Sequence, residues 1–174
     1  MQWKSILITS ACACALAASA APKASTKLSE QDRHFLRFAA ETDMAEAHSG
    51  QIAANNASSR NVKDFGQKLT QDFSNAYGRL LVLAQDSGQT IPRGIDVRRD
   101  RDISRLEQLH GRAFDEQFVR EQIRKDQSVI AGLRREAEHG QDKALRDWAQ
   151  QSLATVESDL MRERQIAKAE KWRS

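Results

Sequence analysis

Four long segments of the chain carry apolar residues at alternating spacings of three and four, the pattern of an amphipathic α-helix. They cover about residues 29–55, a second stretch to about residue 86, then 114–139, and a last one from about residue 142. In the first segment the stripe consists of Phe35, Phe38, Thr42, Ala45, Ser49 and Ile52. The pattern therefore predicts an all-α protein.

The connections between these segments predict how the helices are arranged. Ala57-Ser58-Ser59 and Gly140 leave only short turns, so the first pair and the last pair of helices should form antiparallel hairpins. The connection over about 87–113 is long enough to cross the bundle, and a charged stretch at 96–109 predicts a short helix inside it. We therefore expect a ferritin-like four-helix bundle with one long crossover connection carrying a short extra helix, formed by residues 29–172.

The N-terminal residues predict export. An apolar run over residues 6–18 ends in small residues up to Ala20, which is typical of a signal peptide (1–20) cleaved after Ala20 and followed by a flexible leader (21–28). Cys12 and Cys14 lie inside this signal, and Thr9-Ser10-Ala11 lacks the large aliphatic residue that usually precedes a lipoprotein cysteine. We expect a periplasmic or envelope-associated protein, with peripheral association open and no transmembrane segment after cleavage.

Composition and motifs exclude several function classes. The net charge of +3 is too small to predict a nucleic-acid partner. No glycine-rich phosphate loop or G-x-S-x-G motif is present, and removal of the signal leaves no cysteine for thiol chemistry. We therefore expect no catalytic residues and no enzyme activity, and the partner stays unknown.

Acidic residues at or beside the apolar stripes are the one chemical question that the sequence raises. Each long helix brings one carboxylate to its inner face or close to it: Glu46, Asp72, Asp126 and Asp159. A buried carboxyl group is neutral, pairs with a cation or binds a metal, and a cluster of oxygen ligands suits iron, manganese or calcium. The alternative is an ordinary ion pair or partial solvation, with Arg79, Lys125 and Arg162 as the basic residues within reach.

Histidines give little support to a metal site. The Glu-x-x-His pattern of di-iron bundles occurs at 107–110 and 136–139, but each match stands before a glycine, where a histidine is explained by the helix C-terminus. His34 and His48 lie roughly 21 Å apart along one helix, too far to share an ion. Our first expectation is therefore no cofactor.

Over about residues 31–167 the chain resembles a bacterial family, domain of unknown function 4142. Proteins of that family are often labelled predicted outer-membrane proteins and are grouped with ferritin-like bundles. The marks of the resemblance are Phe35-Leu36, Ala45-Glu46 with Gly50, Val62-Lys63-Asp64-Phe65, Asp72, and Ala113-Phe114-Asp115 with Phe118. The resemblance implies the bundle fold. The family tends to have histidines where this chain has Phe73, Asp126 and Asp159, so the resemblance also weakens a redox metal site.

Three functions are consistent with these features. The first is an exported, non-catalytic binding or stress-related module of the envelope. The alternative is a metal-binding bundle with Glu46, Asp72, Asp126 and Asp159 as oxygen ligands. A periplasmic chaperone ranks last, because few apolar residues lie outside the stripes.

Overall fold

The computed structural model describes residues 27–172, which form five helices. The helices are α1 (Glu30–Asn56), α2 (Arg60–Asp86), α3 (Val97–Glu107), α4 (Gly111–His139) and α5 (Lys143–Ala169). The predicted signal peptide (1–20) and most of the leader lie outside the described residues. Leu28, expected at the end of the leader, is buried in the core.

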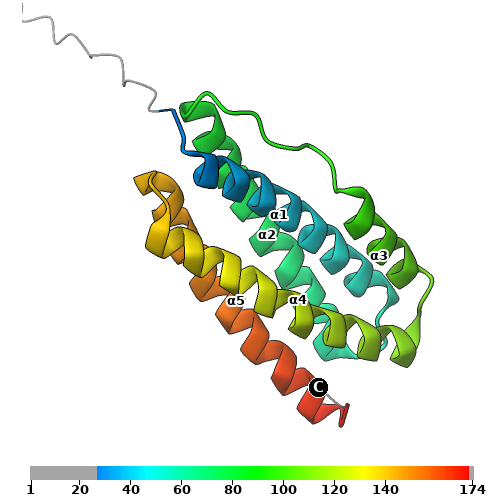
Figure 1. Ribbon diagram of the computed structural model, residues 1–174. Coiled ribbons are helices and arrows are strands. Elements are labelled where there is room, and N and C mark those ends of the chain that lie inside the picture. Colours follow the sequence, from blue (N-terminus) through cyan, green and yellow to red (C-terminus); the bar gives the residue numbers. More distant parts are fainter. Residues whose placement is uncertain (1–26, 173–174) are drawn as a thin grey trace, which may run out of the picture.

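The four long helices form a bundle of two hairpins joined by a crossover (Figure 1). Helices α1 and α2 are antiparallel, and so are α4 and α5. The connection from the end of α2 runs along the bundle to α3, so that α4 starts at the end where α2 starts and the two helices are parallel. This confirms the predicted ferritin-like arrangement, including the short helix within the crossover.

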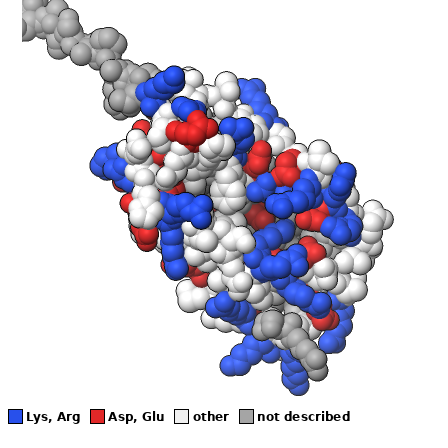
Figure 2. All heavy atoms as spheres, viewed as in Figure 1, with Lys and Arg blue, Asp and Glu red and all other residues white. Residues whose placement is uncertain are grey.

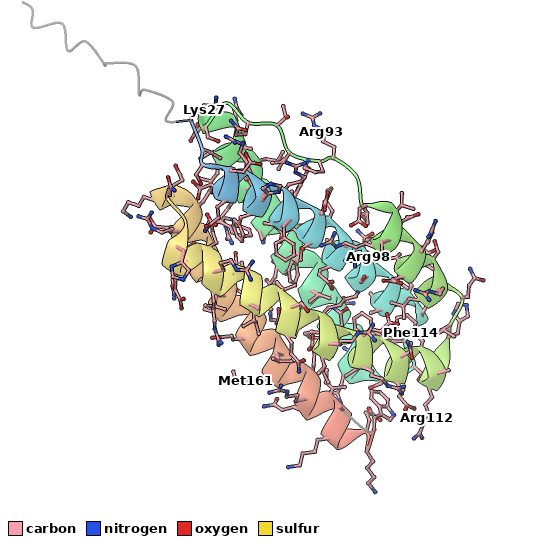
Figure 3. All side chains as sticks on the ribbon, in the orientation of Figure 1. Lys27, Arg93, Arg98, Arg112, Phe114 and Met161 are labelled. Carbon is pink, nitrogen blue, oxygen red and sulfur yellow. The ribbon has the colours of Figure 1, made fainter. Side chains whose placement is uncertain are left out.

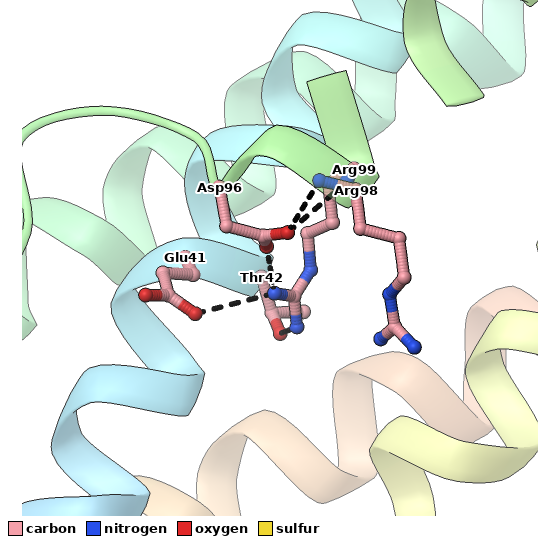
Figure 4. Close-up of polar contacts among 5 residues, drawn as sticks. All are labelled: Glu41, Thr42, Asp96, Arg98 and Arg99. Carbon is pink, nitrogen blue, oxygen red and sulfur yellow. Dashed lines mark hydrogen bonds and ion pairs between the residues drawn. The ribbon is translucent and has the colours of Figure 1, made fainter. Parts of the chain in front are cut away.

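Arg99 makes polar contacts that hold the start of α3 on the outside of α1 (Figure 4). The guanidinium group of Arg99 contacts the carboxylate of Asp96, lies 3.2 Å from Oε2 of Glu41 and donates a hydrogen bond of 3.3 Å to Oγ1 of Thr42. It also lies 5.9 Å from the ring centre of Phe38. A guanidinium group donates hydrogen bonds in its plane and can pack its face on an aromatic ring. Arg99 therefore connects α3 to α1 by polar and cation–π contacts.

The α1–α2 hairpin is packed closely because glycines face each other across it. A Cβ atom on Gly50 would stand 2.5 Å from the carbonyl oxygen of Gly66, and one on Gly66 would stand 2.7 Å from the Cβ of Ala53. Helix α1 is consequently buried over a wider arc than its predicted stripe. The additional buried residues include Leu36, Ala39, Ala40, Asp43, Glu46, Gly50 and Ala53.

Side chains cap the starts of helices α1 and α2, and the cap of α2 comes from another helix. Ser29 and Asp32 form a capping box at the start of α1. Helix α2 has no side-chain cap of its own, and Asp115 of α4 accepts hydrogen bonds from the backbone N–H groups of Ser58 and Ser59 instead, at 3.0 and 2.9 Å. The buried carboxylate of Asp115, at the N-terminus of α2, thus connects the two hairpins at this end of the bundle.

Contacts within each hairpin are far more extensive than those between them. Aromatic rings fill the two ends of the seam between the hairpins. At one end Phe114 stacks on Phe118 with 5.5 Å between ring centres, and at the other Phe35 meets Trp148 edge-on at 5.8 Å. Several buried polar side chains lie between these two ends, and the candidate site is there.

Candidate functional site

Four carboxyl groups lie buried in the interior of the bundle, between the two aromatic ends, and Figure 3 labels Phe114 at one of these ends. None of the four residues is more than 3% exposed. They come from three helices: Glu46 of α1, Asp126 of α4, and Asp159 and Glu163 of α5. Of the four predicted candidates, the structure therefore brings Glu46, Asp126 and Asp159 into the interior.

Asp72, the fourth predicted candidate, lies at the edge of the bundle, with its side chain 34% exposed. The inward position that it was expected to occupy on α2 belongs to Phe73, because burial of the large ring stabilises more than burial of a carboxylate. Lys68 places its ammonium group 2.5 Å from Asp72 and 2.7 Å from the buried Asp159. The cation that joins both acids is thus Lys68, and not Arg79 or Arg162.

Glu46 is satisfied by two residues of α4. The side-chain amide of Gln122 donates to its Oε2 at 2.5 Å, and the ammonium group of Lys125 lies 3.5 Å from its Oε1. Lys125 also donates to Oε1 of Gln122 at 3.1 Å. Lys125 was expected to form an ion pair with Asp126, its neighbour in sequence, but instead contacts Glu46 of α1.

Asp126 and Glu163 lack such partners. Oδ2 of Asp126 and both carboxyl oxygens of Glu163 are buried without a hydrogen-bond partner among the described residues. Burial raises the pKa of both groups; the negative charge of Asp126 raises that of Glu163 further, whereas the side chain of Glu163 lowers that of Asp126. Glu46 and Asp159 raise both pKa values further. The pair therefore holds a proton at neutral pH, because two adjacent buried carboxylates are too costly.

This arrangement does not fit a metal ion well. Within residues 27–172, no group of three or more His, Cys, Asp or Glu side chains stands close enough to hold one. Asp159 faces Lys68, Glu46 faces Gln122 and Lys125, and these contacts occupy oxygens that a metal would need. The histidines of the two Glu-x-x-His matches do not contribute ligands to this cluster. His139 is the last residue of α4, with its side chain 68% exposed, and His110 is the N-cap of α4.

Beside the carboxyl groups a cavity of about 140 Å³ opens into the seam between the hairpins. All four long helices line it. Its apolar wall includes the side chains of Phe38, Phe73, Val129, Leu133, Trp148 and Val156. A cavity of this size is comparable to engineered cavities, of roughly 150 Å³, that hold a benzene molecule.

Two polar groups in this cavity have no partner. Oδ2 of Asp43 and Oγ of Ser152 are buried and make no hydrogen bond with any described residue. Burial raises the pKa of Asp43 well above its ordinary value, the positive charge of Arg79 lowers it, and Glu46 raises it again. Unsatisfied buried polar groups cost stability, so their presence together in a cavity indicates that something else satisfies them.

A further buried acid lies at the end of the bundle where α1 begins. Burial and the adjacent Asp32 raise the pKa of Glu136 to about 7. Asp32 in turn accepts a hydrogen bond of 2.9 Å from the backbone N–H of Gln141, and this bond helps to keep its pKa below the ordinary value although burial opposes it. This pair ties α1 to the α4–α5 turn and has a structural role.

The sequence did not identify Asp43, Gln122 and Glu136 as interior polar residues. Asp43 falls outside the predicted stripe through Thr42, and it is nevertheless buried. Gln122 and Glu136 follow Phe118 and Leu133 at helical spacing, a signal that an extended stripe on α4 would have included.

Comparison with known proteins identifies related sequences and folds. The model of a family described as "Domain of unknown function (DUF4142)" matches residues 17–166. No curated protein matches the chain. A crystal structure of a DUF305 fragment from Deinococcus radiodurans is similar in fold, with a TM-score of 0.71 and 14% sequence identity over 82% of this chain and 99% of that one. None of the helices in the described part of the chain has the length and hydropathy needed to cross a membrane.

Proposed function

We propose, from the premise that this chain belongs to the DUF4142 family of unknown function, that it is an exported, non-catalytic binding module of the cell envelope. Its binding site would be the cavity in the seam between the α1–α2 and α4–α5 hairpins. One observation carries the proposal: Asp43 and Ser152 line a cavity whose wall includes several large apolar side chains, and each has a buried polar atom without a partner among the described residues. Ligand sites commonly combine an apolar wall with a few such polar groups.

Filling the cavity tests this function. Ser152→Leu adds apolar volume where the unpartnered hydroxyl now stands, so it should abolish ligand binding while the bundle stays folded. Ser158→Leu, on the exposed side of α5, is the matched control. Binding is measured by heteronuclear NMR shifts of the protein with a set of small aromatic and aliphatic compounds. If no compound shifts residues of the cavity, or if Ser152→Leu binds as well as the control, the proposal is wrong.

Export is a separate part of the proposal and rests on the sequence alone. An apolar run over 6–18 followed by Ala18-Ser19-Ala20 supports a signal peptide. N-terminal sequencing of the protein isolated from the periplasmic fraction of its cells should give Ala21 as the first residue. Retention of Met1 in a cytosolic fraction would contradict this part and leave the binding cavity unaffected.

Association with the envelope surface is supported by one exposed face. In Figure 2, Lys and Arg side chains gather over α3 and the adjoining part of α4, with acidic side chains among them. The exposed arginines here include Arg98, Arg101, Arg105, Arg112 and Arg124. Anionic headgroups attract such a surface, with an effect of about 1 kcal/mol per basic residue. Co-sedimentation with anionic vesicles that disappears at high salt is the expected result.

Metal analysis of the purified protein tests the alternative function, a metal-binding bundle. Iron, manganese or calcium bound stoichiometrically to the protein purified from its own compartment would favour an oxygen-rich site at Glu46, Asp126 and Asp159. The geometry favours the cavity instead, because Lys68 and Lys125 already neutralise two of these acids.

A further inference from the structure

The cavity in the seam has an electrostatic character that limits what it binds. The charged residues that line it are Asp43, Asp72 and Arg79, and Glu46 lies one helical turn beyond Asp43 on α1. Asp72 is paired with Lys68 and Glu46 with Lys125, whereas Asp43 forms no ion pair with any described residue. A ligand with a positive charge would therefore supply the ion pair that the buried Asp43 lacks.

The wall of the cavity has the composition that recognises organic cations. Aromatic rings of Phe38, Phe73 and Trp148 come from three different helices. The indole N–H of Trp148 is already used, because it donates to the carbonyl oxygen of Ala76 at 3.3 Å. Aromatic faces attract cations and also bury apolar groups, so one wall serves both parts of an amphipathic ligand.

We infer that the cavity binds a small organic cation, a primary ammonium group carried on an apolar body; this inference rests on the proposed function and specifies its ligand class. The ammonium group would donate hydrogen bonds to Oδ2 of Asp43 and Oγ of Ser152, the two atoms that lack partners. The apolar body would lie among the aromatic rings, where 140 Å³ accommodates about one six-membered ring.

Arg79 is the competing cation at this site. It lines the cavity from α2 and interacts electrostatically with Asp43, yet no described residue forms a hydrogen bond or ion pair with its guanidinium group. Its side chain is exposed, so it stands at the mouth of the cavity and leaves the buried carboxyl group unpaired. A ligand that brings its own cation would complete the contact that Arg79 does not make.

Binding of a cation is coupled to a proton. Burial and Glu46 raise the pKa of Asp43, so the empty cavity favours the protonated form of this carboxyl group. Besides Arg79, the charged groups around Asp43 are Asp72 on α2 and Glu46 on α1. Helices α4 and α5 contribute only uncharged side chains to the cavity. An ammonium ion pairs with the ionised form, so Asp43 must release its proton when the cation binds, and affinity should rise with pH.

The test compares a cation with an uncharged molecule of the same size. Benzylammonium and benzyl alcohol are titrated separately into the exported protein, with isothermal calorimetry in two buffers of different ionisation enthalpy. Benzylammonium should bind at least tenfold more tightly at pH 8, and its binding should release a proton to the buffer. Equal affinities, tighter binding of the alcohol, or no binding of either compound would overturn the inference.

Substitutions assign the effect to the cavity. Asp43→Asn preserves shape and should remove the preference for the cation, whereas Arg79→Gln should strengthen binding of benzylammonium severalfold. Asp100→Asn, an exposed acid on α3, should change nothing. Thermal unfolding shows that each variant is folded. Retained binding of benzyl alcohol in Asp43→Asn would leave the binding function intact, and unchanged cation preference in that variant would overturn the inference alone.

Discussion

The side-chain ammonium group of Lys68 lies 2.7 Å from Oδ1 of Asp159, which joins α2 to α5 across the seam between the hairpins. Asp159 is 1% exposed, and burial raises its pKa while Lys68 lowers it. The contact thus places a buried negative charge opposite a half-exposed positive one. The stability of the seam depends on this pairing.

Removal of Lys68 should destabilise the bundle. Lys68→Met leaves Asp159 buried without its cation, and we expect the free energy of unfolding at pH 8 to fall by about 1–2 kcal/mol, less than for a fully buried pair because Lys68 is half exposed. Urea unfolding measures the change. The matched control is Lys143→Met, which breaks an exposed pair with Asp147 and should cost almost nothing. Equal losses in both variants would contradict the prediction.

The buried acids should make the protein more stable at mildly acidic pH than at alkaline pH. Glu136 has a pKa of about 7 in the folded state against 4.5 when solvated, and the pKa values of Asp126 and Glu163 are raised too. Above pH 4.5 the unfolded chain loses protons that the folded state retains, so stability is full below that pH and is lost as the pH rises through 7. Asp32, whose pKa is lowered, acts in the opposite direction only below about pH 4.

Urea unfolding at constant ionic strength checks this pH dependence. The free energy of unfolding should be lower at pH 8 than at pH 5, by an amount on the order of 1–3 kcal/mol. Glu163→Gln, which keeps the neutral form at every pH, should reduce the slope and stabilise the protein at pH 8. Glu138→Gln on the exposed face of α4 is the control. A profile that rises toward pH 8 would show that the interior acids are ionised and paired.

Close approach of α1 and α2 predicts opposite effects for two glycines. Gly50→Ala would place a Cβ 2.5 Å from a backbone oxygen of Gly66, so the helices must separate, at a cost of about 2–4 kcal/mol. Gly78→Ala meets nothing within 4 Å on the exposed side of α2, and it should stabilise by about 0.5–1 kcal/mol. Thermal unfolding of the two variants distinguishes packing from helix propensity. Destabilisation by both substitutions would refute this reading of Gly78.

Asp115 should contribute to stability through the start of α2. Asp115→Ala leaves the N–H groups of Ser58 and Ser59 without their acceptor, and we expect a loss of about 1–2 kcal/mol, as for other helix caps. The neighbouring Glu116→Ala removes only an exposed pair with Arg120 and should be close to neutral. Chemical denaturation compares them, and a larger effect for Glu116→Ala would contradict the capping role.

The fold was predictable because helix periodicity and loop length suffice for a bundle of this kind. The long connection between the second and third long segments correctly indicated the crossover. The interior acids were predicted less well, since periodicity gives the face of a residue only to within one position. Asp72 and Phe73 illustrate this limit: both fit the stripe on α2, and packing against the other hairpin decides which of them is buried.

The cavity could not be predicted from the sequence. Its key residue, Asp43, lies outside the predicted stripe of α1, and the cavity forms only where all four long helices pack together. Lys68 was likewise overlooked, because its two partners lie on different helices. To predict contacts between residues far apart in the chain, one must know how each helix is rotated about its axis relative to the others. A single sequence does not give this rotation.

The crossover has a consequence for the order of folding. Contacts inside a hairpin join neighbouring helices, whereas those across the seam join residues 91 positions apart for Lys68 and Asp159 and 76 for Gln122 and Glu46. Closure of such long loops costs more entropy, so each hairpin should form before the two dock. The interior carboxyl groups remain hydrated until that docking step, and uptake of their protons is therefore the last event on the way to the native state.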